Sequence, residues 1–203
     1  TEGGENLARH VENLKKFGLP VIVAINKFSA DTENEVNQVR QICAELGVDA
    51  IESDHWGNGG AGAEELAEAV VAKLDQNGGN YAPLYEDELP LWDKVRTVAQ
   101  NLYGAQGIIA DKKVRDQFQD LQESGFGHYP VCIAKTQYSF STDPNLKGAP
   151  SNHVVPIREI RIASGAEFVV AVCGNIMTMP GLPRVPAANS IDVDESGEII
   201  GLF

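Results

Sequence analysis

Apolar residues recur along the first 75 residues at spacings that predict three helices and two strands. Spacings of three and four predict amphipathic helices over residues 4–17, 32–46 and 63–75. Short apolar segments at residues 19–25 and 48–53 predict strands. The first of these strands shows no alternation of apolar and polar residues. We therefore expect it to be buried on both faces within a parallel sheet.

This order of elements is typical of one half of a doubly wound α/β sheet, with residues 31–47 as the right-handed crossover. Asp31 is the expected N-cap of the crossover helix. The glycine-rich segment 55–62 is expected to be a loop. Ligands of such sheets bind outside the carboxyl ends of the strands. Residues 26–29 and 54–62 occupy that edge, so we expect a ligand there.

The remainder of the chain predicts further helices and strands and then changes character near residue 135. The pattern predicts helices over residues 90–103 and 112–123 and strands over residues 107–110, 129–134, 155–162, 166–173, 191–193 and 199–202. Loop residues dominate positions 139–153. We therefore expect an α/β domain with a mostly parallel sheet over residues 1–134. A small α+β domain with antiparallel strands is expected over residues 135–203.

Composition excludes several classes of protein. With 16 basic and 29 acidic residues the net charge is −13, which disfavours a nucleic-acid partner. No apolar run approaches 18 residues, so we expect no membrane-spanning segment. Three cysteines form neither a disulfide framework nor a close-spaced zinc site, which fits a reducing compartment. No signal peptide is visible, and because Thr1 is not a start methionine we treat the chain as a possible fragment.

The size of the chain predicts a well-formed core. A compact protein of 21.9 kDa would expose roughly 9,300 Å² of surface and bury about 70 % of what the unfolded chain exposes. Such a core needs no disulfide or metal to stabilise it.

The pair Asn26-Lys27, at the end of the first strand, resembles the base-reading Asn-Lys-x-Asp loop of P-loop GTPases. The fourth position here is Ser29, and one hydroxyl cannot supply the bidentate acceptor that guanine requires. No G-x-x-x-x-G-K-[ST] phosphate loop occurs. The pair alone is equally compatible with a polar strand terminus.

Two large aromatic residues, Phe28 and Trp56, each follow a predicted strand. Their rings could admit one flat heterocycle between them, or they could simply cap the core. His55, beside Trp56, is expected to be a solvated polar residue of a loop. No Ser-His-Asp or Cys-His arrangement can be defended, so we assign no catalytic residue and no metal ligand.

Several motifs occur in the order that one family shows. They are Thr1-Glu2-Gly3-Gly4-Glu5-Asn6-Leu7, Val23-Ala24-Ile25-Asn26-Lys27-Phe28, Trp56-Gly57-x-Gly59-Gly60, Lys135-Thr136-Gln137-Tyr138-Ser139, the stretch 177–188 and the ending 199–203. With them the whole chain resembles the C-terminal portion of the formate–tetrahydrofolate ligases (10-formyltetrahydrofolate synthetases). The resemblance covers about a third of that family's polypeptide.

The resemblance implies an ATP-dependent ligase of one-carbon metabolism. In that family ATP phosphorylates formate to formyl phosphate, and the N10 amine of tetrahydrofolate then attacks the formyl carbon. It further implies Mg²⁺ with the nucleotide, a monovalent cation that supports a homotetramer, and a cytoplasmic location. Residues 1–134 would be the C-terminal part of a nucleotide- and folate-binding domain of P-loop ancestry. The family's catalytic residues match positions upstream of Thr1, so the isolated chain is expected to be inactive.

The resemblance also implies binding residues. The family holds the pterin of folate between two aromatic rings, which match Phe28 and Trp56. Four further residues are expected in the vicinity of the nucleotide: Asn26, Lys27, Tyr138 and Pro150.

Two other functions remain open from the residues alone. One is a GTPase-related domain that uses Asn26-Lys27 to recognise a base. The other is a non-catalytic, acidic interaction module.

Overall fold

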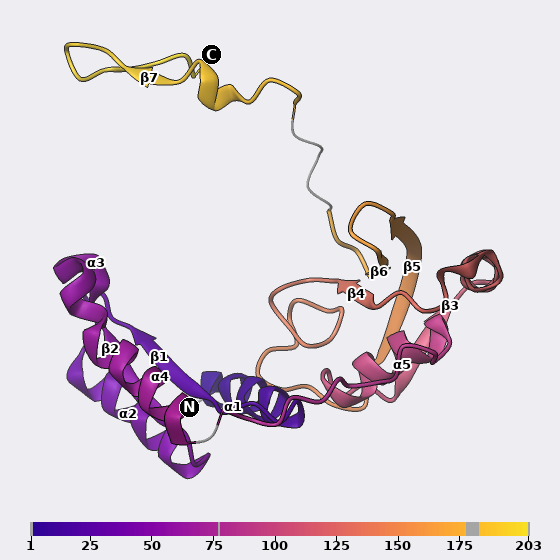
Figure 1. Ribbon diagram of the computed structural model, residues 1–203, viewed down its shortest axis with the longest axis horizontal. Coiled ribbons are helices and arrows are strands. Elements are labelled where there is room, and N and C mark those ends of the chain that lie inside the picture. Colours follow the sequence, from indigo (N-terminus) through magenta and orange to yellow (C-terminus); the bar gives the residue numbers. More distant parts are fainter. Residues whose placement is uncertain (1, 77, 178–182, 203) are drawn as a thin grey trace.

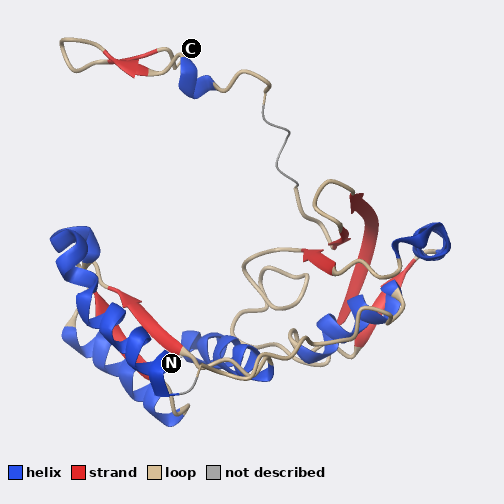
Figure 2. Cartoon of the chain, viewed as in Figure 1, coloured by secondary structure: helices blue, strands red, loops and turns tan. Residues whose placement is uncertain are grey.

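The computed structural model describes residues 2–76, 78–177 and 183–202. These residues form two lobes and an arm (Figure 1). We call residues 2–76 the first lobe, residues 91–173 the second lobe and residues 183–202 the C-terminal arm. Helices and strands both occur in each lobe (Figure 2). The expected mixed α/β class with a mostly parallel sheet and a small extra sheet is confirmed.

The first lobe has the predicted β-α-β order. Its elements are α1 (Glu2–Lys16), β1 (Ile22–Asn26), α2 (Glu33–Glu45), β2 (Asp49–Ser53), α3 (His55–Asn58), the 3₁₀ turn η1 (Gly59–Ala63) and α4 (Glu64–Gln76). Strands β1 and β2 pair in parallel, from Ile22 opposite Asp49 to Asn26 opposite Ser53. The crossover through α2 therefore brings the carboxyl ends of both strands to one edge.

Strand β1 is less buried than its apolar sequence predicts. All five of its residues are half-buried or exposed, so the expectation of burial on both faces is wrong. The reason is that β2 is the strand's single described partner, which leaves the other edge of β1 open. The core of this lobe lies beside the sheet, around Val11, Val21, Cys43 and Val48.

Helix α2 begins one residue later than predicted. Its N-cap is Thr32, whose hydroxyl accepts from the backbone N–H of Glu35 while the Glu35 carboxylate accepts from the N–H of Thr32. This reciprocal capping box satisfies two backbone donors at once. The expected cap, Asp31, instead accepts from the backbone N–H of Phe28 at 2.8 Å. Asp31 therefore shapes the turn before the helix.

The second lobe is built around a four-stranded sheet. Its elements are α5 (Leu91–Asn101), β3 (Gly107–Ala110), α6 (Lys112–Leu121), the wide turn η2 (Gln122–Phe126), β4 (Val131–Ala134), β5 (Val154–Ala163) and β6 (Phe168–Cys173). The strand order is β3-β5-β6-β4, and β5–β6 is the antiparallel pair of this sheet. Strands from both sides of residue 135 share this sheet. The change of sequence character at residue 135 therefore falls within one sheet.

Helices α5 and α6 cover this sheet and bury the larger core of the molecule. Asp111 caps α6 as its sequence predicts, accepting from the backbone N–H of Val114 at 2.9 Å. The buried residues include Leu91, Val95, Ala99, Val114, Phe118, Val155, Ile160, Val169 and Ala171.

Helix α1 is the part of the first lobe that lies beside the second lobe in Figure 1, and it contacts helix ends in both. The Lys15 ammonium donates to the carbonyl of Leu46, the C-cap of α2, at 2.6 Å. The Asn13 amide donates to the carbonyl of Leu102, the C-cap of α5, at 2.8 Å. Carbonyls at helix C-termini have no partner within their own helix. Helix α1 therefore supplies a donor to each lobe and ties them together.

The C-terminal arm carries the predicted terminal hairpin. It contains the 3₁₀ turn η3 (Ala187–Asn189), β7 (Asp192–Val193) and β8 (Ile199–Ile200), and β7 pairs antiparallel with β8. The arm stands apart from both lobes (Figure 1). Part of the family motif at residues 177–188 lies outside the described residues, at positions 178–182.

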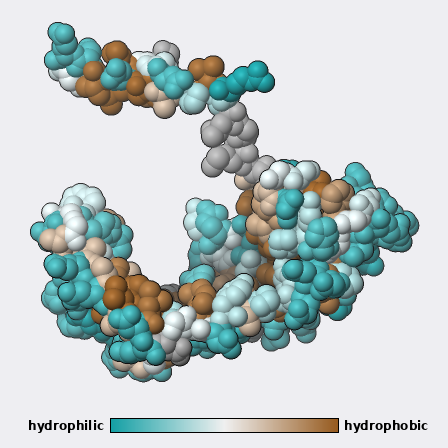
Figure 3. All heavy atoms as spheres, in the orientation of Figure 1, coloured by the Kyte–Doolittle hydropathy of each residue, from teal (hydrophilic) through white to brown (hydrophobic). Residues whose placement is uncertain are grey.

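The chain exposes 13,234 Å², well above the roughly 9,300 Å² of a compact protein of this mass. The excess arises because two small lobes and an extended arm share little surface. Apolar patches are visible on the first lobe and on the arm (Figure 3). They include Val70, Val71 and Leu74 of α4, each more than 40 % exposed.

Among the described residues, no helix combines the length and the apolar character needed to cross a membrane.

The bond from Asn13 to α5 gives a test of the link between the lobes. Asn13→Ala leaves the half-buried carbonyl of Leu102 without this donor and should lower the free energy of unfolding by about 1–3 kcal/mol. Urea unfolding measures this difference. Glu12→Ala, at the adjacent exposed position, is the control and should change stability by less than about 0.5 kcal/mol. Equal effects of the two substitutions would contradict the proposed role of Asn13.

Candidate functional site

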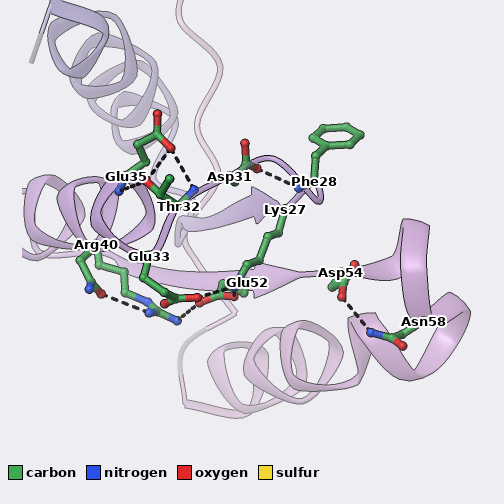
Figure 4. Close-up of polar contacts among 11 residues, drawn as sticks. Lys27, Phe28, Asp31, Thr32, Glu33, Glu35, Arg40, Glu52, Asp54 and Asn58 are labelled. Atoms are coloured by element: carbon green, nitrogen blue, oxygen red, sulfur yellow. Dashed lines mark hydrogen bonds and ion pairs between the residues drawn. The ribbon is translucent and has the colours of Figure 1, made fainter.

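The candidate site lies where β1 and β2 end side by side. Asn26 is opposite Ser53 in the last rung of the pair, and the backbone N–H of Lys27 donates to the carbonyl of Ser53 at 3.1 Å. The segments that follow the two strands therefore leave the sheet from neighbouring positions (Figure 4).

Phe28 is held in place through its backbone. Its N–H donates to the Asp31 carboxylate, and its carbonyl accepts from the N–H of Asp31 at 3.0 Å. These two bonds close a tight turn directly before the capped start of α2. The ring is 48 % exposed and projects away from the strands (Figure 4). The turn therefore presents an apolar ring to solvent.

Trp56 lies on a helical turn rather than in the loop that the glycines predict. Asp54 is the N-cap of α3, accepting from the N–H of Gly57 at 3.3 Å and from the Asn58 amide at 2.8 Å. The prediction of a loop over residues 55–62 is wrong, because the Asp54 cap and the following 3₁₀ turn order the segment. Trp56 is 71 % exposed. Its ring is therefore available to a ligand and does not cap the core.

Gly62 closes this segment back onto its start. The N–H of Asp54 donates to the carbonyl of Gly62 at 2.9 Å. A Cβ atom at position 62 would lie 2.1 Å from the carbonyl oxygen of Asp54. The close approach therefore requires glycine here, whereas Gly60 in the same turn has open space around it.

Lys27 is engaged in an ion-pair network. Its ammonium contacts the carboxylates of Glu33 and Glu52 at 2.9 Å each, and Arg40 contacts the other oxygen of Glu52 at 2.5 Å (Figure 4). The hydrogen bonds to Glu33 and Glu52 raise the pKa of Lys27. The hydrogen bond and positive charge of Lys27, with a smaller contribution from Arg40, lower the pKa of Glu52. Lys27 therefore braces the loop against α2 and β2.

Asn26, the preceding residue, is exposed at the end of β1. The ammonium of its neighbour Lys27 already donates two hydrogen bonds to carboxylates, so the pair has few free donors with which to recognise a nucleotide base. This weakens the GTPase-like alternative, as does Ser29 at the position where a carboxylate would be needed.

Tyr138 and Pro150 lie in the long connection between β4 and β5. Tyr138 is 61 % exposed, and the Lys147 ammonium lies 5.1 Å from the centre of its ring. Pro150 is half-buried. The residues on either side of Tyr138 line a cavity of about 260 Å³, and α1 forms another wall of this cavity. Its lining residues are Asn6, His10, Tyr103, Lys135, Thr136, Gln137, Ser139 and Phe140.

Lys135 gives this cavity a positive charge. Its ammonium donates to the carbonyls of Thr136 and Ser139 and lies 4.9 Å from the centre of the Tyr103 ring. Burial lowers the pKa of Lys135. Both ring nitrogens of His153 are buried, and burial lowers the pKa of this side chain.

Comparison with known proteins places the sequence of this chain in a family. The sequence model of the formate–tetrahydrofolate ligase family matches residues 1–203. The chain belongs to this family. The formate–tetrahydrofolate ligase of Granulibacter bethesdensis is 57 % identical over 202 residues, which cover 100 % of the chain and 35 % of the relative. Those of a Sphingobium and a Ruegeria species are 54 % and 55 % identical, over 100 % and 99 % of the chain and 36 % of each relative. The chain thus spans about a third of the length of these ligases.

The expected binding residues are distributed over both lobes. Phe28 and Trp56 follow adjacent parallel strands of the first lobe. Tyr138 and Pro150 belong to the second lobe. Among the described residues, no hydrogen bond, ion pair or ring contact joins the two pairs. They therefore form two separate parts of the candidate site.

Sequence reasoning did not identify the residues that support these parts. The carboxylates of Glu33 on α2 and Glu52 on β2 both contact Lys27, and the guanidinium of Arg40, also on α2, contacts Glu52. Lys135 meets Tyr103 across a cavity whose other wall is α1. No spacing along the chain signals contacts of this kind.

Gly62 allows a test of how the Trp56 segment is built. Gly62→Ala forces the added methyl group against the backbone of Asp54 and should lower the free energy of unfolding by about 1–3 kcal/mol. Gly60→Ala, the matched control in open space, should change it by less than about 0.5 kcal/mol. Urea unfolding of both variants measures the difference, and equal stabilities would show that the close return to Asp54 does not form.

Proposed function

We propose that this chain is the C-terminal portion of an ATP-dependent ligase that formylates tetrahydrofolate at N10, using formate through formyl phosphate. The chain belongs to the formate–tetrahydrofolate ligase family over its whole length. Its part in the reaction is to bind the pterin ring of the folate between Phe28 and Trp56. The observation that carries this proposal is the presence of two exposed aromatic rings just past the carboxyl ends of paired parallel strands.

A pterin is flat and has two faces that must lose water on binding. A single aromatic ring covers one face, so two rings from separate segments are needed to cover both. Stacked aromatic pairs contribute about 0.5–1.5 kcal/mol beyond the burial of their area. Phe28 and Trp56 have the exposure that such a clamp requires before its ligand binds. Their backbones are already fixed by Asp31 and Asp54, so binding has little main chain to order.

The chemical step requires the folate amine to meet an activated formyl group. ATP transfers its γ-phosphoryl group to a formate oxygen, giving formyl phosphate and ADP. The N10 lone pair then attacks the formyl carbon, the C–O bond to phosphate breaks, and phosphate and a proton leave. In this scheme Phe28 and Trp56 fix the position of the pterin and thereby that of N10. We assign no residue of this chain to the chemistry.

The nucleotide is proposed to lie near Tyr138 and Pro150, with Asn26 and Lys27 in its wider vicinity. The polar cavity lined by Lys135 and Tyr103 supports a polar ligand on that side of the second lobe. ATP would bring Mg²⁺ as its own counterion. Within the described ranges, no three His, Cys, Asp or Glu side chains are placed to hold a metal ion. A monovalent cation, a homotetramer and a cytoplasmic location complete the proposal.

Alanine substitution in the complete ligase tests the clamp. Trp56→Ala and Phe28→Ala should each weaken tetrahydrofolate binding by roughly 5- to 150-fold, because stacking of a heterocycle on an aromatic side chain contributes about 1–3 kcal/mol. Affinity for ATP should stay nearly unchanged. Calorimetric titration with each ligand separates the two. Trp92→Phe is the control, because Trp92 packs edge-on against Phe118 in the second lobe, 5.3 Å between ring centres. Equal losses of folate and ATP affinity would refute the clamp.

The division of labour within the ligase is tested with the 203-residue chain alone. It should produce no 10-formyltetrahydrofolate from formate, ATP and tetrahydrofolate, because the proposal places the chemistry on the remainder of the polypeptide. Product formation is followed by absorbance after acid conversion to the methenyl form, with the complete ligase as the positive control. Turnover by the chain alone would overturn this assignment.

A further inference from the structure

Lys94, in the first turn of α5, is fully buried, with 0 % of its surface exposed. Lysine is almost never fully buried unless its charge is paired. Among the described residues, no carboxylate forms an ion pair with Lys94. Its ammonium instead contacts the backbone carbonyls of Asp87 at 2.5 Å, Gly127 at 2.8 Å and Tyr129 at 3.0 Å.

The three carbonyls match the three N–H groups of a charged ammonium. A neutral amine has two N–H groups and a lone pair, and the lone pair would face a carbonyl oxygen. The cage therefore selects the charged form, and the ring of Tyr85, 5.7 Å from the nitrogen, favours it further. Burial acts in the opposite direction and lowers the pKa of Lys94. Backbone carbonyls that replace a hydration shell are also the ligands of small monovalent cations in proteins.

The cage joins three segments that are separate in sequence. Asp87 precedes α5, whereas Gly127 and Tyr129 lie between α6 and β4. A second bond ties the same segments together, from the backbone N–H of Val131, the first residue of β4, to the Tyr85 hydroxyl at 3.0 Å. The cage therefore fixes the start of the strand whose far end leads to Lys135.

We propose that the carbonyls of Asp87, Gly127 and Tyr129 form a monovalent-cation site that is permanently filled by the ammonium of Lys94. The lysine replaces an exchangeable ion with a tethered one and links α5 to the segment before α5 and to the segment before β4. The site takes a primary ammonium or another small monovalent cation when the tether is removed. It is independent of any cation that acts on assembly of the ligase, because Lys94 occupies it.

The test removes the tether and supplies the lost group from solution. Lys94→Ala deletes three carbons and the nitrogen, which together correspond to n-propylammonium. In the complete ligase this variant should unfold about 5 °C or more below the wild type. Added n-propylammonium should raise its midpoint in a saturable manner. Tetramethylammonium, which has no N–H group, should not do so at equal ionic strength.

Lys94→Met and Lys113→Ala are the matched controls. Methionine fills the channel but places an apolar end against the three carbonyls, so its loss of stability should not be rescued by n-propylammonium. Lys113 is exposed on α6, and its substitution should leave the midpoint within about 1 °C of the wild type. A Lys94→Met variant as stable as the wild type, or a Lys94→Ala variant that n-propylammonium does not stabilise, would overturn the proposal.

If Lys94→Ala accumulates only as insoluble protein, its refolding yield provides the same test. The proposal expects a higher yield with n-propylammonium than with tetramethylammonium. Equal yields would show that the cage has no affinity for a free ammonium group and would contradict it.

Discussion

The parallel pairing of β1 with β2 is the constraint on which the candidate site depends. It fixes Asn26 opposite Ser53, so the chain leaves both strands at one edge. Phe28 and Trp56 are then carried by two independent segments instead of one loop. A change of register by one residue would move them about 3.3 Å relative to each other, which is close to the thickness of one aromatic ring. The spacing of the two rings is therefore set by the backbone of the sheet.

Polar contacts hold the segments that carry these apolar rings. Asp31 and the Thr32–Glu35 capping box fix the turn at Phe28, while Asp54 caps the short helix that carries Trp56. The Lys27 ion pairs brace the first of these segments against its neighbours. The second lobe uses the same device, because the ammonium of Lys94 holds three carbonyls around the start of β4. In both lobes, polar contacts between nearby segments hold the backbone that leads to the candidate ligand sites.

The sequence predicts the elements well because periodicity and capping are local properties. The β-α-β order, the Asp111 cap and the terminal hairpin are confirmed. Two predictions are wrong: that β1 is buried on both faces, and that residues 55–62 form a loop. The burial of β1 depends on which strands flank it. The order of residues 55–62 depends on the hydrogen bond between Asp54 and Gly62, which glycine content does not reveal. Phe28 and Trp56 are recognisable as aromatic residues that follow predicted strands, and the family resemblance supplies their expected role. The partners of Lys94 could not be predicted, because backbone carbonyls leave no signature in a sequence.

The most direct test of the account is a structure of the complete ligase with tetrahydrofolate bound. We expect the pterin to lie parallel to both rings, with one face against Phe28 and the other against Trp56, beyond the ends of β1 and β2. A pterin bound elsewhere, or one with Phe28 and Trp56 turned away from it, would contradict the proposed clamp.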